Sequence, residues 1–264
     1  MSGLRSRANP RVRRWQRLAR DARARRSERC ALIEGPHLVA AYLAQGRRPR
    51  AVLVSEDALG RAEVALLLQR AAIEPVLLSD SVFRSIADTE APTGIAAEIM
   101  FGEGGNRLEE STGCVFLEGI QDAGNVGTII RSSAAFAVGN VVLAKGCADP
   151  WSPKALRAGM GGHFALGVAD GEDLAVAIER FGGKTICAVV RGGMPLHELD
   201  LTGRLGWIFG SEGQGVSEAL AKRAAHRVTI PMATGAESLN VAAAAAICLY
   251  EARRRQLSRD DAPS

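Results

Sequence analysis

The chain has 264 residues, 47% of them hydrophobic, which is enough for two modest domains with cores of their own. Its formal net charge of +4 is uneven, because residues 1–30 hold eleven arginines against Asp21 and Glu28. No apolar run approaches the ~20 residues that a membrane span needs, and the N-terminus lacks the apolar region of a signal peptide, so we expect a cytoplasmic protein.

The cysteines and histidines argue against disulfides and metals. Five cysteines are odd in number, far apart and in apolar surroundings, which is typical of buried thiols in a reducing compartment. The four histidines form no metal-binding pair. We therefore expect no metal site.

The first hundred residues alternate helical and strand-like patterns. A helix is predicted over residues 11–29, and further helices over 36–43, 59–72 and 81–86. Strands are predicted at 31–34, 51–55, 75–78 and 94–100. This alternation indicates a compact α/β sandwich.

The basic arm suggests a polyanionic partner. Arginine suits phosphate through its planar fork, so Arg11, Arg13, Arg14 and Arg17 are predicted to bind RNA. The alternative is a solvated helix face. Trp15 could stack on a base, but an aromatic side chain on a helix stripe more often anchors the helix to its own domain.

A glycine-rich polar stretch, residues 101–112, is predicted to be a linker. After it, strands are predicted at 114–117, 141–143, 164–168, 185–190, 205–209 and 228–230. Helices are predicted at 125–137, 152–158, 174–181 and 241–249. Six strands with helices between them indicate a mostly parallel sheet covered on both faces.

Two loops follow strands of this sheet, where open α/β sheets bind ligands. Residues 210–215 place Glu212 among three glycines, so that backbone N–H groups can approach a ligand closely. Residues 231–240 bring Ser238 and Asn240 to the start of an alanine-rich helix, which either residue could simply cap.

Three ordered segments, residues 122–132, 209–217 and 230–247, resemble the motifs of the SpoU (TrmH-like) RNA 2′-O-ribose methyltransferases. Residues 31–38 and 92–97 resemble the L30e-like substrate-binding domain that precedes the catalytic domain in this family. The resemblance implies an L30e-like α/β sandwich over residues 1–100 and, after the linker, a catalytic domain over 113–264. It also implies a deep trefoil knot in a mostly parallel α/β sheet, which the residue patterns alone would not predict.

The same resemblance implies S-adenosyl-L-methionine as the cofactor and a homodimer through the catalytic domain, with each active site drawing residues from both subunits. Residues carried over to the cofactor pocket are Gly210, Ile230, Met232 and Leu239. Those carried over to the catalytic cluster are Asn125, Arg131, Glu212, Ser238 and Asn240.

The family assigns Arg131 as a general base, which conflicts with the very high pKa of arginine. Either the Arg131 pKa is unusually perturbed, or Arg131 holds a phosphate while another group accepts the proton. Lys154 and Arg157 lie three residues apart on one helix face, where they could reach one run of RNA phosphates or form a solvated face.

The resemblance thus predicts methylation of a ribose 2′-hydroxyl in RNA, with 23S-type ribosomal RNA preferred. The alternatives are ribose or base-nitrogen methylation of tRNA, and an inactive knotted RNA-binding assembly factor.

Overall fold

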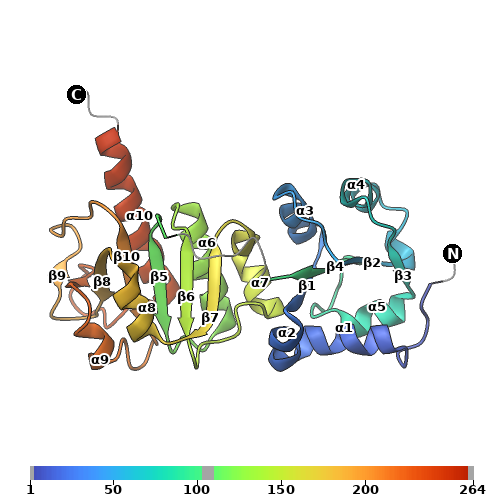
Figure 1. Cartoon of the computed structure of the whole chain (residues 1–264), viewed down its shortest axis with the longest axis horizontal. Coiled ribbons are helices and arrows are strands. Elements are labelled where there is room, and N and C mark those ends of the chain that lie inside the picture. Colours follow the sequence, from blue (N-terminus) through green and yellow to red (C-terminus); the bar gives the residue numbers. More distant parts are fainter. Residues whose placement is uncertain (1–2, 103–109, 261–264) are drawn as a thin grey trace.

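The computed structural model describes residues 3–102 and 110–260, so part of the predicted linker, residues 103–109, lies outside the described residues. Two α/β units, one from each half of the chain, lie side by side along the long axis of the molecule (Figure 1). The first contains a four-stranded sheet and the second a seven-stranded sheet.

The first sheet is mixed. Its order is β1-β4-β2-β3, with β4 antiparallel to β1 and β2, and β3 parallel to β2. These strands are β1 (Cys30–Glu34), β2 (Ala51–Ser55), β3 (Val76–Leu78) and β4 (Ile95–Met100). The helices are α1 (Pro10–Arg20), α2 (Ala22–Glu28), α3 (Pro36–Ala44), η1 (Glu56–Ala58), α4 (Ala62–Ala71) and α5 (Asp80–Ile86).

Helices cover both faces of this sheet, as predicted for a sandwich (Figure 1). Alternate strand residues point to opposite faces, so Leu53 packs with α1 and α5 whereas Val52 and Val54 pack with α3 and α4. Trp15 is 2% exposed, and its Nε1–H donates to Glu98 at 2.9 Å. Trp15 is therefore an anchor within its own domain.

The prediction of one continuous helix over residues 11–29 is wrong. Asp21 has an extended backbone (φ −116°, ψ 112°), and its side chain accepts from the Arg23 N–H at 2.8 Å, so that it caps a new helix. Aspartate favours such caps over helix interiors. The break redirects α2 and brings Arg25 into the interior.

The second sheet has the order β7-β6-β5-β10-β8-β11-β9, and its pairs among the described residues are all parallel. Its strands are β5 (Cys114–Glu118), β6 (Asn140–Ala144), β7 (Gly167–Glu172), β8 (Lys184–Ala188), β9 (Met194–Pro195), β10 (Leu205–Gly210) and β11 (His226–Thr229). The sequence did not predict β9, a two-residue edge strand with a proline. β7 begins three residues later than predicted, because residues 162–164 form a 3₁₀ turn.

Helices also cover both faces of the second sheet, as predicted. They are α6 (Ala123–Ala135), α7 (Pro153–Gly159), η2 (Gly162–Phe164), α8 (Leu174–Phe181), α9 (Glu218–Ala221) and α10 (Val241–Asp260). Val115 and Leu117 of β5 belong to the core that contains α6 and α10, whereas Phe116 belongs to the core under α8. The α10 helix continues well past the predicted end at residue 249, and its last turns project beyond the sheet (Figure 1).

Strand β11 lies between β8 and β9, although residues 189–193 alone join those two strands. This short connection therefore crosses β11 closely, and the Gly193 N–H donates to Thr229 Oγ1 at 3.1 Å. The chain then returns through residues 196–204 to β10. Such an order is compatible with the predicted knot, which stays an expectation for this fold. Among the described residues, no helix has the length and apolar character needed to cross a membrane.

The two units contact each other through a buried ion pair. The Arg25 side chain is 4% exposed and Asp149 8%, and Arg25 Nη2 lies 2.6 Å from Asp149 Oδ2. Arg25 Nη1 also donates to the Leu18 carbonyl at 2.6 Å. Phe101 stacks on Trp151 beside this pair, with ring centroids 4.4 Å apart. Arg25 thus connects α1, α2 and the second unit.

We expect Arg25→Met to destabilise the protein by about 3 kcal/mol, because it leaves a buried carboxylate without its counter-charge. The control is Arg26→Met, since Arg26 pairs with Asp170 across the same interface but is 49% exposed. That change should cost less than about 1 kcal/mol. Denaturant unfolding followed by circular dichroism measures both, and equal losses would contradict this role for Arg25.

Candidate functional site

The candidate site lies at the carboxyl ends of β5 and β10, two central neighbours of the parallel sheet. Their register pairs Leu117 with Phe209 and Glu118 with Gly210, so the loops that follow the two strands begin side by side. The Glu118 carboxylate accepts from the Ser217 N–H at 2.7 Å and fixes the far end of the β10 loop. Sequence reasoning missed this contact, because no local pattern marks it.

The Glu212 carboxylate brings together three distant segments. Its Oε1 accepts from the side-chain amide of Asn125, at the start of α6, and from Asn240 Nδ2 at 3.1 Å. Asn240 Nδ2 also lies 3.2 Å from Asn125 Oδ1. Three of the five predicted catalytic residues therefore form one hydrogen-bonded cluster.

Asn240 also caps α10, which is one of the two roles that the sequence allowed for it. Its Oδ1 accepts from the Ala242 and Ala243 N–H groups at 3.0 and 3.3 Å. The cap uses the side-chain oxygen and leaves the side-chain nitrogen for Glu212. A helix terminus thus fixes the orientation of the amide.

Asp122 does the same for Asn125. Its Oδ1 accepts from the Gly124 and Asn125 N–H groups at 2.6 and 3.1 Å, and its Oδ2 pairs with Lys154 Nζ at 2.7 Å. The hydrogen bond from Lys154, followed by those from the helix N-terminus, lowers the Asp122 pKa. The sequence analysis missed this role, although an aspartate directly before a helix is a capping signal.

The loop after β10 depends on Gly210. A Cβ atom there would lie 2.0 Å from the backbone of Gly215, because the loop curls back so that the Gly215 N–H donates to the Ser211 carbonyl at 2.8 Å. Only glycine allows this approach without moving the backbone.

A cavity of about 360 Å³ opens between this loop, the end of β11 and the start of α10. All four predicted cofactor residues line it, together with two predicted catalytic residues: Gly210, Ile230, Met232, Leu239, Glu212 and Ser238. Much of the remaining wall is apolar, including Val189, Phe209 and Val228. No hydrogen bond to another described residue fixes the exposed Ser238 side chain.

The same loop also lines a second cavity of about 340 Å³. Gly119, Ile120 and Gln121 form one wall, and residues 211–214 form the other. Glu212 lines both cavities. Ligands in both cavities could therefore lie next to Glu212.

Arg131 lies outside the cluster. It is exposed on α6, with the backbone of Gly162 packed against it, and it forms no hydrogen bond or ion pair with a described residue. It lines neither cavity. The structure thus places this predicted catalytic residue on the same helix as Asn125 but outside the hydrogen-bonded cluster of its own chain.

The predicted RNA-binding arginines of α1 fall into two groups. Arg11 and Arg13 are exposed and have no ion pair with a described residue, although the Arg11 guanidinium lies over the Trp15 ring at 5.2 Å. Arg14, by contrast, donates to both Glu98 oxygens at 2.8 and 2.9 Å and to Glu28. Arg17 is 65% exposed and pairs weakly with Glu28 at 3.7 Å.

The two predicted RNA contacts on α7 are also paired within the protein. Lys154 pairs with Asp122, and Arg157 Nη1 lies 2.5 Å from Asp88 Oδ2 in the first unit. All four side chains are between 38% and 57% exposed, so solvent screens both pairs.

The five cysteines are buried and free, as predicted. No group of three or more potential metal ligands occurs in the part of the chain that the structure describes.

Comparisons with known proteins agree with this architecture. Residues 113–250 match the SpoU rRNA Methylase family model, and residues 9–97 match the MRM3-like substrate binding domain. A crystal structure of an AdoMet-bound rRNA methyltransferase from Sinorhizobium meliloti superposes with a TM-score of 0.82 at 25% identity, covering 96% of this chain and 98% of that one.

Two curated relatives align over nearly their whole length. One is an uncharacterized tRNA/rRNA methyltransferase of Synechocystis, 34% identical over 97% of this chain and 95% of that protein. The other is the 23S rRNA (guanosine(2553)-2′-O)-methyltransferase RlmP of Bacillus subtilis, 31% identical over 96% of this chain and 100% of that protein. The resemblance found in the sequence motifs is thus confirmed, and the chain belongs to the SpoU rRNA methylase family.

Proposed function

We propose that this protein uses S-adenosylmethionine to methylate a ribose 2′-hydroxyl in ribosomal RNA. The observation that carries this proposal is that Glu212, held by Asn125 and Asn240, lines two cavities, the first of which is also lined by the motif residues Ile230, Met232 and Leu239. The printed names of the relatives support it, since RlmP methylates a guanosine 2′-oxygen of 23S rRNA. An enzyme of this kind would work where ribosomes assemble. On this basis we also propose a cytoplasmic location.

The first cavity suits the cofactor. Its volume of about 360 Å³ is within the range of small-molecule sites, and its apolar walls could hold an adenine ring. The curled loop after Gly210 exposes backbone N–H and C=O groups for the polar parts. When bound, S-adenosylmethionine supplies a methyl group that its sulfonium already activates for transfer.

The second cavity would receive the target nucleotide. Glu212 lines both cavities and is held by two amide donors, so its carboxylate can orient a ribose hydroxyl with little further rearrangement. The cluster also argues against an inactive RNA-binding protein, which would have no need to hold this carboxylate between two cavities. Ser238, at the rim of the first cavity, would complete the orienting set.

Arg131 would hold a phosphate beside the reacting ribose. A guanidinium group stays protonated in proteins and matches phosphate through its fork, so binding and orientation suit it better than proton removal. Its lack of a partner among the described residues leaves it available for this contact.

We further propose a homodimer in which Arg131 serves the active site of the other subunit. Arg131 contacts none of Asn125, Glu212 and Asn240 within its own chain. Ile247, Tyr250 and Leu257 form an exposed apolar stripe on α10, where they are 39%, 55% and 46% exposed. Such a stripe is typical of a helix that packs against a partner.

Arg131→Ala should lower single-turnover methyl transfer to ribosomal RNA by about 10²–10⁴-fold, the range for a lost positioning or acid–base group. Cofactor affinity should not change, because Arg131 lines neither cavity. Arg131→Lys keeps the charge without the fork and should restore only part of the rate. Arg70→Ala, an exposed arginine on α4, is the control. A near-normal rate for the alanine variant would remove Arg131 from the mechanism.

The dimer can be tested by mixing two inactive variants, Arg131→Ala and Asn240→Ala. If Arg131 acts across a two-fold interface, mixed dimers contain one intact site, and random exchange restores about a quarter of wild-type activity. Light scattering checks that each variant is dimeric. Restored activity would support the composite site, whereas a mixture as inactive as its components would contradict it.

The basic helix should add sequence-independent RNA affinity through Arg11 and Arg13. Replacing both by alanine should weaken RNA binding and reduce the slope of log K against log salt by roughly 0.7–0.9 per lost phosphate contact. Arg70→Ala, on the opposite face of the first sheet, should leave the slope unchanged. An unchanged slope in the double variant would contradict these phosphate contacts. Arg11 and Arg13 would then only form a solvated helix face.

A further inference from the structure

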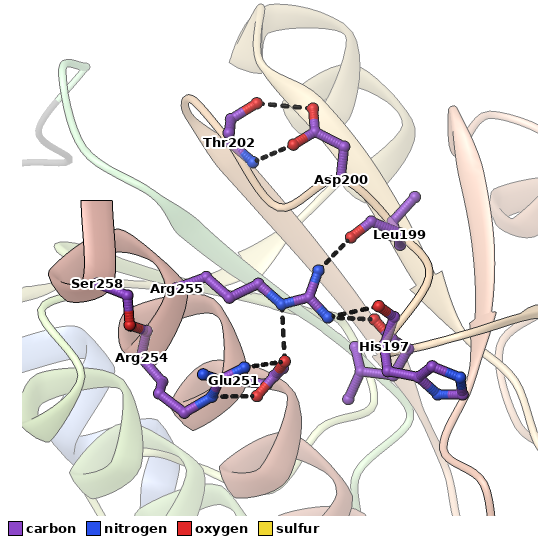
Figure 2. A network of polar contacts seen from close by, with 9 residues as sticks. His197, Leu199, Asp200, Thr202, Glu251, Arg254, Arg255 and Ser258 are labelled. Atoms are coloured by element: carbon purple, nitrogen blue, oxygen red, sulfur yellow. Dashed lines mark hydrogen bonds and ion pairs between the residues drawn. The ribbon is translucent and has the colours of Figure 1, made fainter. Parts of the chain in front are cut away.

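Arg255 on α10 forms an unusually complete set of contacts with a segment that has no regular secondary structure (Figure 2). Its Nη1 donates to the Leu199 carbonyl at 2.7 Å, and its Nη2 donates to the carbonyls of His197 at 2.8 Å and Leu196 at 3.4 Å. Its Nε donates to the Glu251 carboxylate at 2.7 Å. One side chain thus connects the final helix to three backbone carbonyls of residues 196–199.

The clamped segment, residues 196–199, continues directly from β9. Leu196 and Leu199 are 5% and 3% exposed and belong to the main core, and the Leu196 N–H donates to the Thr229 carbonyl at 2.9 Å. β9 itself pairs with Val228 and Thr229 of β11. The segment therefore holds the carboxyl end of β11 against the rest of the sheet.

Of the two elements that Arg255 joins, only α10 lines the first cavity directly, whereas residues 196–199 are connected to other residues of its wall. Val189 and Val190 precede the clamped segment, Val228 and Ile230 lie at the end of β11, and Ala244 belongs to α10. If residues 196–199 moved away from α10, the segment 189–193 that crosses β11 could move with them. We expect the cavity to become wider as a result. The contacts of Arg255 lie outside the cavity, because Arg255 does not line it.

Glu251 fixes the orientation of this guanidinium. Hydrogen bonds from Arg254, and then from Arg255, lower the pKa of Glu251 to about 2, so the carboxylate is ionised at neutral pH. A lysine could not donate to four acceptors spread around a plane. The neighbouring Arg254 also pairs with Glu251, at 2.8 Å, but it contacts no carbonyl of the clamped segment.

We propose that Arg255 is a positioning residue for the cofactor cavity, whose shape it maintains by fastening residues 196–199 to α10. This inference rests on the proposed function, because it takes S-adenosylmethionine to be the ligand of that cavity. Arg255 touches no reacting atom. It acts by keeping the walls formed by β11 and α10 at the spacing that the cofactor requires.

Calorimetric titration of the full-length protein with S-adenosylmethionine, without RNA, tests the proposal. Arg255→Ala should raise the Kd by about 10- to 100-fold, as expected for a small number of lost hydrogen bonds coupled to binding. Arg255→Lys should restore little of the affinity. Arg254→Ala, the matched control, should bind within about twofold of wild type. Amide hydrogen exchange over residues 189–200 should accelerate in the Arg255 variants alone.

A second readout separates positioning from a general loss of folded protein. With saturating RNA, Arg255→Lys should raise the KM for S-adenosylmethionine while kcat stays within about threefold of wild type. Partial unfolding would lower kcat and the binding stoichiometry without changing KM. Unchanged Kd and KM in both Arg255 variants, with wild type binding normally, would overturn this inference alone. A wild-type protein that does not bind S-adenosylmethionine would overturn the proposed function as well.

Discussion

The rest of the candidate site depends on the hydrogen bonds that hold the Glu212 carboxylate in place. It accepts hydrogen bonds from Asn125 and Asn240, which are 115 residues apart in the chain. Each asparagine is held at the start of a helix, one through the Asp122 cap and the other by capping α10 itself. The starts of two helices and the end of one strand therefore determine the position of a single carboxylate. The site can form only when the parallel sheet has brought these three ends together.

The two α/β units contribute differently to this arrangement. The second unit forms both cavities, and the first packs on it through Arg25 and Asp149 and through the pair of Arg157 with Asp88. The Arg157 pair is solvent-screened and the Arg25 pair is buried, so the latter contributes more to the contact between the units. Because α7 carries Arg157 and packs on α6 through a close approach at Gly127, the first unit is connected to the helix that bears Asn125 and Arg131.

Much of this could be predicted from the sequence. Alternating strand and helix patterns indicated both sheets, and the resemblance of three segments to the family motifs indicated that Asn125, Glu212 and Asn240 would belong to one cluster. What could not be predicted depends on partners far away in the chain. In the sequence, Arg14 cannot be told from the other arginines of α1, and only the structure shows that it pairs with Glu98. Arg255 belongs to no sequence motif, so its contact with the Leu199 carbonyl could not be predicted. The break at Asp21 was missed because arginine-rich helical periodicity continues on both sides of it.

The measurement that tests the central claim most directly is the chemical position of the transferred methyl group. Wild-type protein is incubated with labelled S-adenosylmethionine and 23S ribosomal RNA, and the RNA is digested to nucleosides and analysed by mass spectrometry. We predict label in a single 2′-O-methylated nucleoside, and none with Glu212→Ala. Label on a base nitrogen, or no label with RNA that lacks the modification, would contradict it.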